Sequence, residues 1–287
     1  MPSNTNIERR EILKYSALGI LGLSIPSFTL NSNPANSNFD FNQESLPKHY
    51  PNINPEIISD VVGKSHFDLE GVQKLVDKRP ELARCVWEWR FGDFESAIGA
   101  ASHVGRRDIA LYLLSKGARP TLFTYAMLGS YDIVKTTITS FPGIEKNMGP
   151  HGISLLRHAY AGERMKDKMS AIEIENLKKT ISFLESLEGS DGEKYIDVSS
   201  EEQKKYLGDY KYGTVEKDGF SITINMRKLL SLGPIGDFGG ALYKTGNNTF
   251  IYNGAPSVNI TFEIENDIVK SLTITDPDIS IIAKKVN

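Results

Sequence analysis

Two patterns of hydrophobic and polar positions divide the chain. From about residue 56 to residue 190, apolar side chains recur at helical spacing, as Ile109, Tyr112 and Leu113 do. From about residue 195 to the end, apolar and polar residues alternate, which is typical of strands with one buried face. The two patterns predict an α+β protein, with a helical part followed by an antiparallel β domain folded as a meander or partial barrel.

The helical part repeats a unit in which a short helix with small residues ends at a glycine. The three clearest copies begin near Ser96, Thr121 and Ser154, and their terminal glycines are Gly105, Gly129 and Gly162. Because glycine adopts the left-handed conformation that ends a helix, we expect that role at all three positions. With an opening unit at 67–82 and a closing helix at 171–187, the region 56–190 predicts four helical pairs that stack into one core.

Four runs of alternating residues define the predicted strands of the region 195–287. They are separated by short polar segments that contain glycine, asparagine or aspartate, as hairpin turns do. The predicted strands are 220–224, 249–252, 258–264 and 269–274.

The first helical unit resembles an ankyrin repeat. Residues 96–102 stand where that family has Thr-Pro-Leu-His-x-Ala-Ala, Gly105 matches its helix-ending glycine, and residues 108–118 match its second helix. Ser96-Ala97 replaces the Thr-Pro pair, and Gly99 replaces the histidine. The resemblance implies a stack of repeats that binds a partner on its surface and carries no catalytic machinery.

The β domain resembles the small accessory domain of penicillin-binding-type serine hydrolases. The resemblance is carried by Tyr206-Leu207-Gly208-x-Tyr210 and by the Phe-x-Ile-x-x-x-x-Val-x-x-Leu pattern at 262–272. The catalytic domain of that family has no counterpart in the pattern. Ser45-x-x-Lys48 and Lys244-Thr245-Gly246 repeat its motif letters, but the first lies in a Pro-rich leader and the second at a predicted turn. The resemblance therefore implies a fold and not a reaction.

The first 37 residues have the order of a signal peptide. Arg9-Arg10 precedes an apolar stretch, and Ala35-Asn36-Ser37 supplies the small residues of a cleavage site. The arginine pair resembles the twin-arginine export motif, and an ordinary secretory signal is the alternative. We expect residues 38–55 to form a disordered leader, and the mature chain to be periplasmic or extracellular with no stable membrane span.

The composition of the chain limits which ligands it can bind and which covalent links it can form. The 287-residue chain has a net charge of −3 and no run of basic residues, which argues against nucleic-acid binding. Cys85 is its only cysteine, so neither an intramolecular disulfide nor a multi-cysteine metal site is expected. We expect Cys85 to be a packed thiol. No cofactor fingerprint occurs in the sequence.

Three groups of residues are candidates for binding. His103, Arg106 and Arg107 surround one glycine turn, and His151 and His158 belong to the third unit. Equivalent turns of a repeat stack line up, so these side chains are expected either to converge on one pocket or to satisfy backbone groups of neighbouring turns. Trp87 and Trp89 offer either a ligand platform or a packing contact. A metal site is not expected, because His151 and His158 are too far apart to share a helix face.

These observations favour a non-catalytic binding or scaffold protein of the cell envelope. Its partner is expected to be another protein or a small envelope ligand, recognised on the repeat surface. The alternative is an enzyme or ligand carrier with a His/Arg pocket on the repeats or at their junction with the β domain. Convergence of His103, Arg107, His151 and His158 distinguishes the two.

Overall fold

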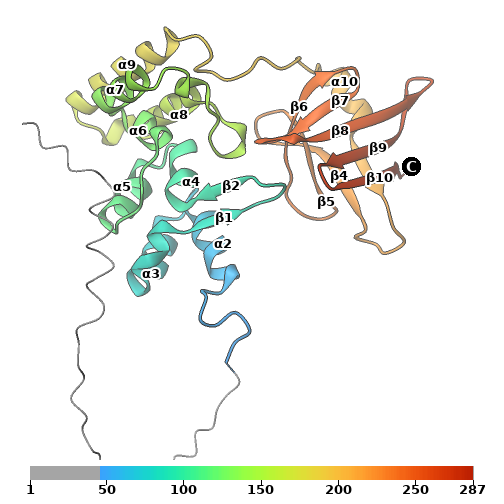
Figure 1. The fold of residues 1–287 in the computed structure, drawn as a ribbon, viewed down its shortest axis with the longest axis horizontal. Helices are drawn as coiled ribbons and strands as arrows, with labels where there is room; N and C mark the ends of the chain where they lie inside the picture. The colour runs from blue at the N-terminus through green and yellow to red at the C-terminus, as the bar shows by residue number, and fades with distance from the viewer. Residues whose placement is uncertain (1–45, 287) are drawn as a thin grey trace, which may run out of the picture. The chain divides into compact units, whose positions relative to one another are not determined.

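Helices precede strands along most of the chain in the computed structural model, which describes residues 46–286 (Figure 1). The predicted signal peptide and residues 38–45 of the predicted leader, Ser45 among them, therefore lie outside the described residues. Residues His49–Asn287 belong to one compact unit. The prediction of a helical part followed by an antiparallel β domain is confirmed.

The helical part consists of short helices joined by tight turns. Its 3-10 helices are η1 (Pro80–Arg84), η2 (Ile144–Lys146), η3 (Pro150–Gly152) and η4 (Gly162–Lys168). The α-helices of the described chain are α2 (Pro55–Lys64), α3 (Leu69–Lys78), α4 (Ala97–His103), α5 (Arg107–Ser115), α6 (Leu122–Leu128), α7 (Tyr131–Ser140), α8 (Leu155–Ala161), α9 (Ala171–Glu185) and α10 (Ser200–Tyr206).

Helices α2 to α9 contact one another in a regular order. Each helix packs on its neighbour in the pairs α2–α3, α4–α5, α6–α7 and α8–α9, and α2, α4, α6 and α8 also contact each other in series. The starts of α4, α6 and α8 are fixed by side-chain caps, because Ser96, Thr121 and Ser154 each accept a hydrogen bond from a backbone N–H in the first turn. Small buried residues such as Ala101 and Ala126 let these helices approach closely.

The three repeat glycines do not all play the expected role. Gly105 and Gly129 are left-handed, with φ of 72° and 71°, and end their helices as predicted. The prediction is wrong for Gly162, whose φ of −58° is right-handed. A Cβ on Gly162 would lie 2.2 Å from the carbonyl oxygen of Met127, so this position needs glycine for close packing and not for chain reversal.

A β-hairpin that the periodicity did not predict lies between η1 and α4. Strands β1 (Val86–Glu88) and β2 (Phe94–Ser96) are antiparallel. Phe91 and Gly92 both have positive φ, which matches the sharp turn of a short hairpin. In β2 the side chain of Phe94 is exposed and that of Glu95 is fully buried, so the hairpin directs a carboxylate into the helical part.

The β domain is a closed barrel in which each strand pairs with the next in sequence, so the expected meander is present and its closure goes beyond the expected partial barrel. Strand β10 pairs with β9 on one side and with β3 on the other, which closes the ring. The strands are β3 (Gly208–Lys211), β4 (Gly219–Ile224), β5 (Leu230–Pro234), β6 (Gly240–Gly246), β7 (Thr249–Tyr252), β8 (Ala255–Glu265), β9 (Ile268–Asp276) and β10 (Ile279–Lys285). Four of these strands had not been predicted: β3, β5, β6 and β10.

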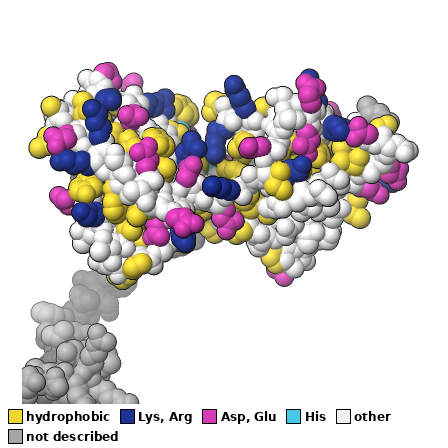
Figure 2. Space-filling model, turned by 90° about the horizontal axis from the view of Figure 1, so that it is seen from above, with side chains coloured by type: hydrophobic (Ala, Val, Ile, Leu, Met, Phe, Trp, Pro, Cys, Tyr) yellow, Lys and Arg dark blue, Asp and Glu magenta, His cyan; other side chains and the backbone are white. Residues whose placement is uncertain are grey.

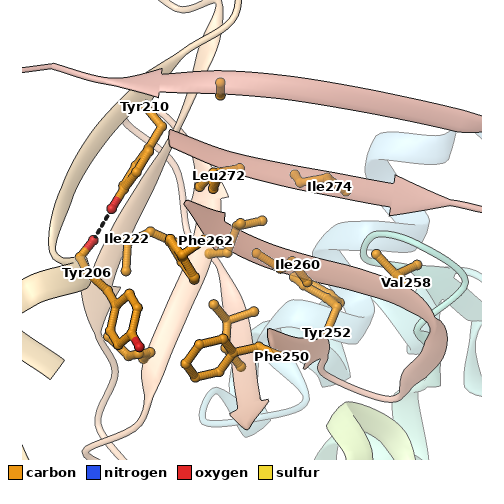
Figure 3. Close-up of a cluster of buried hydrophobic side chains, with 14 of the residues drawn as sticks. Tyr206, Tyr210, Ile222, Phe250, Tyr252, Val258, Ile260, Phe262, Leu272 and Ile274 are labelled. Atoms are coloured by element: carbon orange, nitrogen blue, oxygen red, sulfur yellow. Dashed lines mark hydrogen bonds between the residues drawn. The ribbon is translucent and has the colours of Figure 1, made fainter. Parts of the chain in front are cut away.

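Side chains fill the interior of the barrel (Figure 3). Tyr206 and Tyr210 of the Tyr-x-x-x-Tyr motif are both buried there, and the Tyr210 hydroxyl donates a 2.6 Å hydrogen bond to the carbonyl of Tyr206. Phe250 and Phe262 contact each other edge to face in the same core. The Lys244-Thr245-Gly246 sequence lies at the end of β6, where Lys244 forms an ion pair with Glu202.

Charged side chains of both signs are interspersed on the face drawn in Figure 2. Among the described residues, no helix has the length and apolar character needed to cross a membrane.

Candidate metal centre

Four side chains of the helical part converge on one point. His66, Glu95, His103 and His151 each present a ligand atom, and these four atoms lie within 4.8 Å of one another. From the carboxylate of Glu95, the Nε2 atoms of His103, His151 and His66 are 3.0, 3.3 and 3.4 Å away. Three imidazoles thus surround one carboxylate.

Each of the four residues belongs to a different segment. His66 lies in the turn after α2, Glu95 in β2, His103 at the end of α4, and His151 within η3. Contacts of α4 with α2, β2 and η3 hold these segments against one another. Packing of the helices, together with the inward face of the hairpin, therefore builds the cluster.

The imidazole of His66 is oriented by the end of its own helix. Its Nδ1 lies 3.1 Å from the carbonyl oxygen of Val62 and 3.0 Å from that of Gly63. Because carbonyl oxygens only accept, Nδ1 carries the proton and donates it. The other ring nitrogen of His66, Nε2, therefore faces the cluster.

Asp93 fixes His151 in the same way and also holds its backbone. One carboxylate oxygen accepts from the backbone N–H of His151 at 2.9 Å, and the other accepts from its Nδ1–H at 2.7 Å. His151 has a φ of 59°, a left-handed conformation that is uncommon for a residue other than glycine. Such strain persists where surrounding contacts enforce it and is typical of functional sites. A carboxylate behind the ring of a histidine is the usual support of a metal ligand.

Glu95 has no access to water, since its side-chain exposure is 0%. The indole Nε1–H of Trp89 donates to its Oε2 at 2.8 Å. Burial alone would raise the pKa of Glu95, but the contacts with His103 and His151 outweigh it and hold that pKa below its usual range. Glu95 is therefore an anion inside the protein.

Two buried atoms of the cluster have no hydrogen-bond partner among the described residues. They are Oε1 of Glu95 and Nε2 of His103, which lie only 3.0 Å apart. Their separation suits a hydrogen bond, but their orientation does not. Buried polar atoms nearly always have a partner, and one ion bound to both atoms would supply it.

The three histidines of this region that show a pKa shift differ in its direction. Burial lowers the pKa of His103, and Glu95 offsets this only in part. Burial would lower the pKa of His151, but its hydrogen bond to Asp93 and the nearby negative charge of Glu95 raise that pKa to about 10. Burial lowers the pKa of His158 to about 4, so that ring is neutral.

The candidate residues from the sequence fall into two sets. His103 and His151 converge. His158 packs beside His103, with ring centroids 6.4 Å apart, but its Nδ1–H donates to the carbonyl of Ser154. It is not one of the four clustered residues. Arg106 binds Asp108, and Arg107 binds Glu173 and the carbonyl of Leu128, so neither arginine joins the histidines.

The two tryptophans pack against the core of the helical part. Trp89 also donates to Glu95, so its ring makes the packing contact and its N–H holds a carboxylate of the cluster. Cys85 is half buried beside the same core, and burial raises the pKa of its thiol to about 11, as expected for a packed thiol.

Sequence reasoning missed three residues of the site: His66, Asp93 and Glu95. No two of the four clustered residues have the spacing of a helical or hairpin ligand motif. The one local signal was the acidic pair Asp93-x-Glu95 between aromatic residues, because a strand that alternates with Phe94 outward must direct Glu95 inward.

The residue types and distances fit a transition-metal ion. A tetrahedral ion with bonds of about 2.1 Å holds its ligand atoms about 3.4 Å apart, near the separations around Glu95. Imidazole is a preferred ligand of Zn²⁺, Fe²⁺, Ni²⁺ and Cu²⁺, whereas Ca²⁺ and Mg²⁺ prefer oxygen alone. His66 Nε2, His103 Nε2, His151 Nε2 and the Glu95 carboxylate would hold the ion.

Comparisons of this chain with models of protein families, with characterised proteins and with solved structures gave no match.

Proposed function

We propose that this protein is a mononuclear metalloprotein that binds one divalent transition-metal ion through His66, Glu95, His103 and His151. The observation that carries the proposal is a pair of buried atoms, Glu95 Oε1 and His103 Nε2, which lie 3.0 Å apart and have no hydrogen-bond partner within residues 46–286.

The surroundings of the cluster support metal binding and not a purely structural network. His66 and His151 each use Nδ1–H on a protein acceptor, which leaves Nε2 as the coordinating atom. Trp89 and Asp93 add contacts to a ligand without occupying the point where the four atoms meet. Once His151 has released its Nε2 proton to coordinate, three neutral imidazoles and one carboxylate carry a net charge of −1, so a divalent cation gives the first coordination shell a charge of about +1.

Three imidazoles and one carboxylate leave a free position on an ion that takes five or six ligands. A bound ion of this kind polarises an oxygen ligand or lowers the pKa of a bound water. This favours the ligand-carrier or enzyme alternative over the scaffold interpretation of the sequence. Binding of a partner on the repeat surface stays a prediction.

Two other expectations agree with this proposal. The serial contacts of α2, α4, α6 and α8 support the ankyrin resemblance, which we retain as a proposal. Export through the twin-arginine route, inferred from Arg9-Arg10 alone, would move a chain that had already folded around its metal.

Metal titration of the purified full chain tests the proposal. We expect the chelator-treated protein to bind one equivalent of Zn²⁺ or Co²⁺ with a Kd below about 1 μM. His66→Ala removes a ligand that is partly exposed, and we expect it to weaken binding at least about 100-fold without unfolding the chain. Glu95→Gln should have a similar or larger effect.

Glu81→Gln is the matched control, since Glu81 is exposed on η1 and takes no part in the cluster. Circular dichroism establishes that each variant is folded. Equal metal affinity in His66→Ala, Glu95→Gln and the unaltered chain would contradict the proposed site.

A further inference from the structure

A cavity of about 430 Å³ adjoins the histidine cluster. His103 and His151 are among its lining residues, so two of the proposed metal ligands face the space directly. Cavities of this size are typical of small-molecule sites. A molecule in the cavity would therefore have access to a free position on the ion.

Arg227 supplies a positive charge to the same cavity. Arg157 also lines it, but the guanidinium of Arg157 binds Asp191 through two contacts of 2.9 and 3.1 Å, which balances its charge. Arg227 forms no ion pair within residues 46–286, and its Nη1 donates only to the hydroxyl of Tyr243 at 3.0 Å. Arg227 is thus available to an anion.

The loop that carries Arg227 is held in place by the Asn225 side chain. The Asn225 Oδ1 accepts from the backbone N–H groups of Arg227 and Leu229 at 2.9 and 3.1 Å. Gln203 donates to the carbonyl of Lys228 at 2.9 Å. These contacts, with the one to Tyr243, keep the guanidinium beside the cavity without an acidic partner, which lowers the entropic cost of binding an anion.

The walls between these polar groups are mainly apolar. Val104, Ile153, Met226 and Ala241 contribute to the lining. A ligand that suits this cavity has an oxygen donor for the metal, a carbon body for the apolar walls, and an anionic group for Arg227. A small dicarboxylic acid has all three.

We propose that the metal centre takes a small dicarboxylic acid from this cavity, with one carboxylate as an exchangeable ligand of the ion and the other paired with Arg227. This inference rests on the proposed metal site and names the class of molecule that the site receives.

Co²⁺ loaded into the full chain tests it, because the visible spectrum of Co²⁺ responds to a change of ligand. The probes are acetate, inorganic phosphate and the dicarboxylates malonate, succinate, glutarate and adipate, whose lengths increase in steps. We expect one dicarboxylate to bind at least about tenfold more tightly than acetate and phosphate. Arg227→Gln should abolish that advantage while the cobalt content of the protein stays the same.

Arg119→Gln is the matched control, since Arg119 is exposed after α5 and does not line the cavity. It should keep the full preference. If cobalt binds and no probe changes its spectrum, or if phosphate binds most tightly, or if Arg227→Gln behaves as the unaltered chain does, the inference is overturned and the metal site stands. If cobalt does not bind, the proposed function falls as well.

Discussion

At the scale of single residues, the contact between Asp93 and His151 orders the site. Asp93 is buried and accepts three hydrogen bonds, from the backbone and ring of His151 and from the Asn253 amide at 2.9 Å. Asp93→Asn keeps the size of the side chain but replaces an acceptor with an NH₂ group, so one of these contacts becomes repulsive. We expect metal affinity to fall about 10- to 100-fold, measured by competition with a chromophoric chelator.

The control for this substitution is Asp237→Asn. Asp237 is exposed and binds Arg90, so the same chemical change is made at a site away from the cluster. Metal affinity should be unchanged in that variant. A loss of equal size in both variants would mean that Asp93 acts through general stability and not through His151.

At the scale of elements, α4 is the helix on which the site depends. It contacts α2, α6 and α8, and it carries His103 at its end. Ala101 is fully buried in α4, where a larger side chain meets these neighbours. We expect Ala101→Leu to lower the free energy of unfolding by about 1–3 kcal/mol, measured by urea denaturation of the full chain.

Ala171→Leu makes the same change at the exposed first residue of α9. Its effect should stay within about 0.5 kcal/mol. If Ala101→Leu is equally harmless, the close approach of α4 to its neighbours does not limit stability.

At the scale of the whole molecule, a bound ion would join four segments that are distant in sequence. Because the unfolded chain does not present the four ligands together, metal binding stabilises the folded state, by about 4 kcal/mol when free metal is a thousandfold above Kd. With roughly 2–4 °C of Tm per kcal/mol for a chain of this size, a chelator should lower Tm by on the order of 10 °C. Differential scanning calorimetry of the full chain measures the shift.

His66→Ala is again informative in this experiment, because a site weakened about 100-fold should show about a third of the chelator-induced shift in Tm, or less. The same chelator-induced shift in this variant would show that the stabilising metal is held elsewhere.

The sequence by itself determined the local structure. Periodicity separated the helical part from the β domain, because a 3.6-residue or a two-residue repeat reflects contacts within a few positions. The starts of three helical units near Ser96, Thr121 and Ser154 could be placed for the same reason, as could the left-handed Gly105 and Gly129. His103 and His151 were two of the candidates, and their side chains do converge, since they lie at turns that the packed helices bring together.

Only the tertiary structure decided how these parts combine. Closure of the barrel depends on pairing β3 with β10, and nothing in either strand specifies its partner. Arg106 and Arg107 lie three and four residues after His103, yet their side chains bind Asp108 and Glu173 and do not join the histidines. His66 and Glu95 join His103 and His151 because helix packing and the hairpin direct them inward, and that direction is a property of the packed molecule and not of any short segment.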